Sequence, residues 1–167
     1  FMATGMALRT SAIDAAVRDA IANGATQLVI LGAGYDGRAW RMKELAGVKV
    51  FEVDHPATQR DKRSRVNELP AAIGDVTFVS IDFEREGLIS VLRRAGFDSS
   101  QRTCWIWEGV VMYLTRDAMR ATLAAVAESS PPGSTLIVNY HTTVRRFIAR
   151  MLFKLIGEPH ISAWTKD

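Results

Sequence analysis

Five short apolar segments recur along the chain, separated by longer stretches in which apolar residues return every three or four positions. The segments are rich in Val, Ile, Phe and Trp and are shorter than typical helices, which is characteristic of strands that are buried on both faces of a parallel sheet. The pattern therefore predicts five buried strands, at residues 27–31, 48–54, 76–82, 103–109 and 134–140.

Three of the intervening stretches predict helices. The first runs from Ser11 to Gly24 and opens with a capping-box pattern, Ser11 followed three residues later by Asp14. The second spans residues 87–97 and keeps its leucines and valine on one face. The third has Thr115 as its N-cap and stops at a Pro-Pro-Gly run. An amphipathic tail over residues 144–159 is also expected to be helical.

Strands that alternate with helices predict an α/β fold, a Rossmann-like, doubly wound and mostly parallel sheet. The 167 residues suffice for a single domain. We expect an N-terminal helical segment (1–26), a Rossmann-like core (27–141) and part of a lid or a C-terminal helix (142–167). Little chain follows the fifth strand, so we interpret the sequence as a fragment that lacks the terminal strand pair of such folds.

Composition excludes several kinds of site. The single cysteine, Cys104, cannot form an internal disulfide and is expected to be a core thiol, and the three histidines are scattered, so no metal site is predicted. The net charge is +3. The basic run Arg60–Arg65 is interpreted as a solvated helix face, because no aromatic platform accompanies it, and no nucleic acid is expected. No apolar run is long enough to span a bilayer, and a cytoplasmic location is expected.

A glycine loop after the first strand poses the main question about function. Gly32, Gly34 and Gly37 in "GAGYDG" follow the G-x-G-x-x-G spacing of dinucleotide-binding loops. Asp36, however, puts a negative charge where a pyrophosphate would dock. Either the loop binds no ligand and Asp36 simply caps the following helix, or the ligand is not a dinucleotide.

Four of the five strand ends carry a carboxylate, at the sheet edge where open α/β folds bind ligands. Because like charges about 4 Å apart repel by about 4 kcal/mol at an intermediate dielectric, a diphosphate would be disfavoured there. A cationic nucleoside without phosphate, such as S-adenosylmethionine, would be favoured. In that arrangement Asp36 faces the cationic end, Asp54 accepts the ribose hydroxyls, and Asp82 accepts the adenine amino group while Phe83 packs on the ring. The fourth acid is Glu108.

The motifs "LGAGYDGRAWR", "FEVDHP", "IDFE" and "WEGVVMYLT", in this order, resemble those of the leucine carboxyl methyltransferase-like family, most of all its actinobacterial branch. The resemblance runs from about residue 7 to residue 159 and implies a class I methyltransferase fold with S-adenosyl-L-methionine as cofactor. It adds Arg9 as the residue that pairs with the methionine carboxylate. It also implies that Gly32 contacts the cofactor through its backbone and that Glu108 faces its methionine part. The family usually has Asp-Thr-Arg where this chain has Asp36-Gly37-Arg38, so we interpret the third fingerprint glycine as a coincidence.

The methyl acceptor is expected to be a small molecule or a peptide terminus that is methylated on oxygen, as a carboxylate or a hydroxyl. A carboxylate needs no general base, whereas a hydroxyl would benefit from one, and Tyr113 and His141 are the candidates near strand ends. Two alternatives stay open: an NAD(P)-dependent oxidoreductase that uses the glycine loop, and a nucleoside-binding domain without catalysis. The sequence leaves the oligomeric state undetermined.

Overall fold

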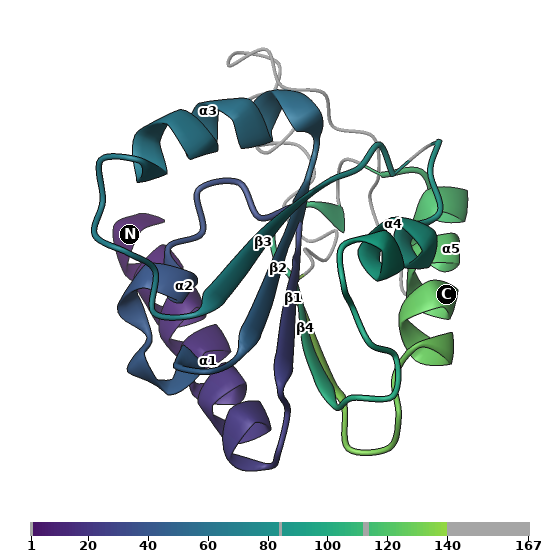
Figure 1. Cartoon of the computed structure of the whole chain (residues 1–167), viewed down its shortest axis with the longest axis horizontal. Coiled ribbons are helices and arrows are strands. Elements are labelled where there is room, and N and C mark those ends of the chain that lie inside the picture. Colours follow the sequence, from purple (N-terminus) through teal and green to yellow (C-terminus); the bar gives the residue numbers. More distant parts are fainter. Residues whose placement is uncertain (1, 84, 112–113, 140–167) are drawn as a thin grey trace.

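Five parallel strands form one sheet in the computed structural model, which describes residues 2–83, 85–111 and 114–139. The sheet order is β3-β2-β1-β4-β5 (Figure 1), so the prediction of a doubly wound parallel sheet is confirmed. The first strand has the predicted bounds, and the others lie within two residues of theirs. The strands are β1 (Gln27–Leu31), β2 (Lys49–Asp54), β3 (Asp75–Ser80), β4 (Thr103–Trp107) and β5 (Thr135–Val138).

Helices cover both faces of the sheet. In Figure 1, α1, α2 and α3 lie on one side, and α4 and α5 lie on the other. Within the described ranges, no helix is both long enough and apolar enough to cross a membrane. The helical elements are α1 (Met2–Ala22), α2 (Arg38–Arg41), the 3-10 turn η1 (Lys43–Leu45), α3 (Pro56–Val66), α4 (Leu88–Arg94) and α5 (Arg116–Glu128).

The first helix corrects the prediction that a helix begins at Ser11. It begins at Met2, so Ser11 and Asp14 lie inside α1 and form no capping box at its start. The sequence pattern missed the added turns because they bury little: Met6 and Leu8 are exposed. The predicted end is confirmed, since α1 stops at Ala22 and Gly24 adopts a positive φ of 92°, as is common just past a helix end. The predicted N-cap of α5 is also confirmed, because the Thr115 side chain accepts a hydrogen bond from the Ala118 N–H.

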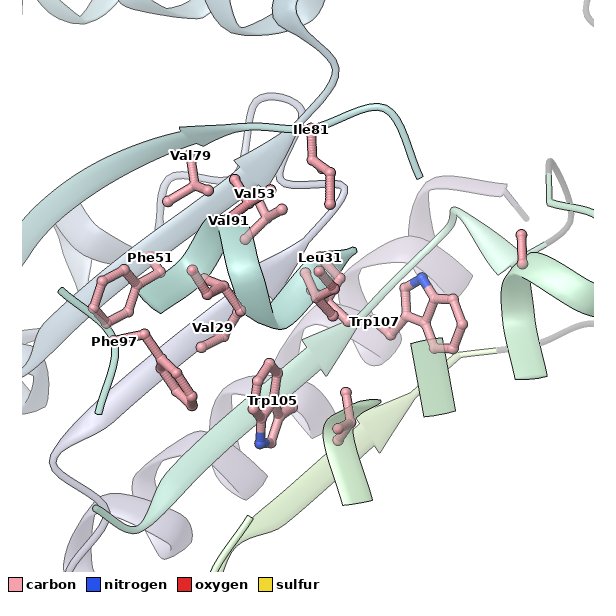
Figure 2. Close-up of a cluster of buried hydrophobic side chains, with 14 of the residues drawn as sticks. Val29, Leu31, Phe51, Val53, Val79, Ile81, Val91, Phe97, Trp105 and Trp107 are labelled. Carbon is pink, nitrogen blue, oxygen red and sulfur yellow. The ribbon is translucent and has the colours of Figure 1, made fainter. Parts of the chain in front are cut away.

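Two hydrophobic cores form because successive side chains of each strand point to opposite faces. Figure 2 shows the core on the α4 and α5 side, where Trp105 and Trp107 of β4 lie beside Val29 and Leu31 of β1. Phe97 packs against the Trp105 ring with 5.4 Å between centroids, and the Trp105 indole N–H donates to Ser130 Oγ. The core on the other face packs α1, α2 and η1 against the alternate strand residues.

Cys104 lies in the second core and supplies a test of this packing. Its side chain is fully buried, and burial raises the pKa of the thiol to about 12. At pH 8 only about one thiol in ten thousand is then ionised, and the thiolate is the reactive form. We expect 5,5′-dithiobis(2-nitrobenzoate) to leave the folded chain unmodified and to react with one thiol per chain in guanidinium chloride. Rapid reaction without denaturant would contradict this packing.

The strand order reverses between β1 and β4, and this switch point is where open α/β sheets form a ligand crevice. The register places Leu31 beside Val53 of β2 and Trp107 of β4. The residues that follow these three strands therefore emerge at the same edge of the sheet. They include the glycine loop, Asp54 and Glu108.

Candidate functional site

The glycine loop turns sharply away from β1 but stays attached to β2. The N–H groups of Gly32 and Ala33 both donate to the Val53 carbonyl, at 2.7 and 3.0 Å. Gly32 has a φ of 68°, and a Cβ atom built on it would lie 2.1 Å from Val110 Cγ2 in the segment after β4. Gly32 is therefore required both by its backbone conformation and by the close approach of this neighbouring segment.

Gly37 differs from the first glycine of the loop. Its φ is −104°, which other residues adopt readily, and a Cβ atom there would meet nothing within 4 Å. Nothing in the local geometry thus requires glycine at this position. This agrees with the interpretation that the third fingerprint glycine is a coincidence.

Asp54 ends β2 and reaches back to the loop. Its Oδ2 accepts a hydrogen bond from the Gly34 N–H at 2.5 Å, and its Oδ1 accepts from the His55 N–H at 2.6 Å. The Gly34 N–H, which in a dinucleotide site would face a phosphate, is thus directed at a carboxylate of the protein. A carboxylate has about four acceptor positions, so Asp54 retains capacity for two further hydroxyl donors.

Arg38 connects three acids around the loop. Its side chain is only 3% exposed and pairs with Asp14 of α1 at 2.8 Å, with Glu108 at 3.2 Å, and with Asp36. Asp36 Oδ1 also accepts from the Arg38 N–H at the start of α2, which is the capping role considered as an alternative for this residue. The acids at this edge of the sheet are therefore accompanied by a buried cation, which the sequence analysis did not identify.

The pKa values of Arg38 and Asp14 are shifted in the directions that favour their charged forms. Burial opposes the charge of Arg38, but the neighbouring Asp36, Asp14 and Glu108 outweigh it and raise the pKa of the guanidinium. Burial likewise opposes ionisation of Asp14, yet hydrogen bonds from Arg41 and Arg38 lower the pKa of that carboxyl below its ordinary value. The Arg38–Asp14 pair is therefore an ion pair at neutral pH.

Arg9 comes to the same edge of the sheet from α1. Its Nε lies 2.7 Å from Glu108 Oε1, and its side chain is one-third exposed. The contact is an ion pair without hydrogen-bond geometry, since Arg9 Nε has no hydrogen-bond acceptor. Two of the predicted cofactor residues, Arg9 and Glu108, are therefore in direct contact.

Asp82 and Phe83 lie farther along the sheet edge, directly after β3. The Asp82 N–H donates to Glu86 Oε2 at 3.0 Å, while Arg85 approaches the Asp82 carboxylate at 3.5 Å. Phe83 is half-buried against the core that contains the tryptophans. The role of this pair beside adenine stays a prediction.

The structure brings together most of the predicted residues. Asp36 and Glu108 share Arg38, Arg9 joins Glu108, and Asp54 holds Gly34. The catalytic candidates Tyr113 and His141 lie outside the described residues, as does the predicted helical tail. Among the described residues, no group of three or more His, Cys, Asp or Glu side chains could hold a metal ion.

The basic run Arg60–Arg65 on α3 corrects a second prediction. Arg60, Arg63 and Arg65 are exposed, as expected for a solvated face, but Lys62 is buried and pairs with Glu52 of β2 at 2.5 Å. The local sequence offers no apolar periodicity that would mark Lys62 as an inward position. The only available signal was an acid, Glu52, inside an apolar strand, since a buried acid needs a cationic partner.

Comparison with known proteins matches the sequence of this chain to one protein family. The sequence model described as leucine carboxyl methyltransferase matches residues 1–127. A protein of Mycobacteroides abscessus named "putative S-adenosyl-L-methionine-dependent methyltransferase" is 40% identical over 137 residues, which is 81% of this chain and 45% of the relative. A Streptomyces coelicolor protein with the same descriptive name is 38% identical over 89% of this chain and 53% of its own length. The chain thus spans about half the length of the curated relatives it matches.

Solved structures share the fold at low sequence identity. A methyltransferase structure from Thermobifida fusca, itself described as putative, superposes with a TM-score of 0.69 at 18% identity, over 92% of this chain and 60% of that one. The glycopeptide N-methyltransferase MtfA in complex with S-adenosyl-L-methionine gives a TM-score of 0.50 at 20% identity, over 71% of this chain and 48% of that one. These likenesses concern the fold of the sheet and its helices.

Proposed function

The chain belongs to the leucine carboxyl methyltransferase family, and we propose that it binds S-adenosyl-L-methionine at the β1/β4 switch point and supports transfer of the methyl group to an oxygen acceptor. The observation that carries the proposal is the gathering of Asp36, Asp54 and Glu108 at the ends of three neighbouring strands, around a loop whose Gly34 N–H is directed at Asp54. A cationic sulfonium and a ribose suit this edge of the sheet, whereas a diphosphate would meet carboxylates.

The proposed cofactor contacts follow from the chemistry of each side chain. Asp54 accepts from the two ribose hydroxyls with its remaining acceptor positions. The Arg9 guanidinium pairs with the methionine carboxylate, and Glu108 faces the methionine ammonium. Gly32 allows close approach of the backbone, and Asp82 and Phe83 take the adenine side. These roles explain why acids and an arginine alternate at the same edge.

Bound S-adenosyl-L-methionine supplies an electrophilic methyl group on a positively charged sulfur. Held by Arg9, Asp54 and Glu108, the cofactor would supply this methyl group to an acceptor oxygen in line with the carbon–sulfur bond, and sulfur would leave with the electron pair of that bond. The contribution of the protein is alignment of the reacting atoms and exclusion of water. An acceptor carboxylate is already ionised at neutral pH and loses no proton, so the described residues would need to supply no base for it. We therefore favour a carboxylate of a small molecule or peptide terminus as the acceptor.

Substitution of Asp54 tests the cofactor site. Because each of the two proposed hydrogen bonds to the charged acceptor contributes about 1.5–3 kcal/mol, Asp54→Ala is expected to weaken binding of S-adenosylhomocysteine by at least a hundredfold in isothermal titration calorimetry. Asp75→Ala is the matched control, because Asp75 is an exposed acid at the opposite end of the neighbouring strand β3. Unchanged affinity in Asp54→Ala, with a native circular dichroism spectrum, would contradict the proposed site.

The acceptor class can be tested separately. Candidate acceptors are incubated with the chain and S-adenosyl-L-methionine that carries tritium in its methyl group. A carboxyl methyl ester releases volatile methanol in mild alkali, whereas methyl ethers and methylamines do not. Alkali-stable product would remove the carboxylate from consideration and leave the cofactor proposal intact.

A further inference from the structure

Lys62 of α3 is a buried cation beneath the glycine loop. The side chain is 4% exposed, although three arginines of the same basic run are exposed. Its Nζ lies 2.5 Å from Glu52 Oε2 and 5.4 Å from the centre of the Trp40 ring. The same Nζ donates a hydrogen bond to the Asp36 carbonyl at 2.7 Å. One ammonium thus connects the core of the sheet to the loop above it.

The ion pair itself does not explain why a charged residue is buried here. Glu52 is fully buried, burial raises the pKa of its carboxyl to about 7, and Lys62 only partly opposes this shift. Neither carboxylate oxygen of Glu52 accepts a hydrogen bond of good geometry. Replacing such a pair with apolar residues of similar volume is often neutral or stabilising. The well-formed hydrogen bond of Lys62 is the one to the loop.

Two consecutive residues of the loop contact two consecutive residues of α3. Tyr35 donates its hydroxyl hydrogen to the Asp61 carboxylate, and the next loop residue, Asp36, accepts from the next helix residue, Lys62. The Tyr35–Asp61 contact is exposed to solvent, so it contributes little to the stability of the loop conformation. The Lys62 contact is shielded from water, so it is the stronger constraint on where the loop backbone lies.

We propose that Lys62 is a positioning residue for the cofactor loop, which it holds by donating to the Asp36 carbonyl, and that Glu52 serves to keep its ammonium in place. Lys62 binds the backbone carbonyl of Asp36 and not its carboxylate. It acts on the backbone that turns between Gly34, whose N–H meets Asp54, and Arg38, whose side chain binds Asp36 and Glu108. The inference rests on the proposed function in so far as its readout is cofactor affinity.

Replacing both charged residues with uncharged ones distinguishes an effect of Lys62 on the position of the loop from an effect on the stability of the fold. Lys62→Met alone leaves Glu52 buried without a partner, so both thermal stability and affinity for S-adenosylhomocysteine are expected to fall. The double variant Glu52→Met/Lys62→Met removes both charges. We expect it to recover the melting temperature of the wild type but to bind S-adenosylhomocysteine about tenfold more weakly, because the hydrogen bond to the loop is still missing. Arg60→Met, an exposed position on the same helix, controls for the loss of one positive charge and should match the wild type.

The outcome that overturns the inference is a double variant with the affinity of the wild type, since Lys62 would then only neutralise Glu52. Glu52→Gln/Lys62→Met provides a second neutral pair with a nearly isosteric side chain at position 52. Failure of both pairs to fold would also overturn it, because Lys62 would then be needed for the fold itself.

Hydrogen exchange distinguishes this inference from the proposed function. In the ligand-free chain, the Gly34 and Arg38 amides are expected to exchange several-fold faster in the double variant than in the wild type, because the loop is less constrained. A wild-type chain that binds no S-adenosylhomocysteine would overturn the proposed function, while faster exchange in the variant would still support the positioning role of Lys62. Equal exchange rates would contradict that role directly.

Discussion

Arg38→Met is expected to destabilise the fold by about 3–5 kcal/mol, since it leaves buried acids without their cation. Asp14, Asp36 and Glu108 come from three separate elements and all contact this one guanidinium, which is 3% exposed. For a chain of this size the change corresponds to a fall of roughly 10 °C in the melting temperature. Thermal unfolding followed by circular dichroism measures it.

Arg41→Met is the matched control for that substitution. Arg41 also binds Asp14, at 2.8 Å, but its side chain is 45% exposed and solvent can replace the lost contact. We expect a loss of about 1 kcal/mol or less. Equal losses of unfolding free energy in the two variants would contradict the burial of Arg38 among three acids.

Gly32→Ala is expected to cost about 2–5 kcal/mol. The backbone at this position has a positive φ, which costs a residue with a side chain about 1–2 kcal/mol. The added methyl group also overlaps Val110, which adds about 1–3 kcal/mol. Because the overlap forces apart the segments that follow β1 and β4, affinity for S-adenosylhomocysteine should fall as well. Urea unfolding and calorimetric titration measure the two effects.

Gly37→Ala should change stability by less than about 1 kcal/mol, because its φ is ordinary and the space around it is open. The comparison with Gly32→Ala separates a glycine that the fold requires from one that only completes a sequence pattern. A large loss of stability at Gly37 would mean that the third glycine has a structural role that this geometry does not contain.

The strands could be predicted from the sequence because each is a short apolar run buried on both faces. Gln27–Leu31 is the clearest case: all five residues are buried, and the predicted and observed bounds agree. The start of α1 could not be predicted, because its first turns expose Met6 and Leu8 and so carry no amphipathic period. Helix propensity alone, which is high for the Ala, Met, Leu and Arg of this stretch, is a weak signal.

The acids of the candidate site could be predicted, but the buried cations Arg38 and Lys62 could not. Asp54 ends a strand, and Asp36 and Glu108 lie in segments that follow strands, so their meeting at one edge is a consequence of parallel topology. Arg38 and Lys62 lie on helices, and which of their side chains turn inward depends on how those helices pack. Lys62 sits in a run of charged residues that looks uniformly exposed, although it alone of the basic residues in that run is buried.

The central claim is that this sheet edge favours an adenosine cofactor without phosphate. Parallel calorimetric titrations of the wild-type chain with S-adenosylhomocysteine and with NADH test it most directly. Our account predicts saturable binding of S-adenosylhomocysteine and none of NADH at the same concentrations. Binding of NADH in preference to S-adenosylhomocysteine would contradict it, because a diphosphate would then be accepted among the carboxylates of Asp36, Asp54 and Glu108.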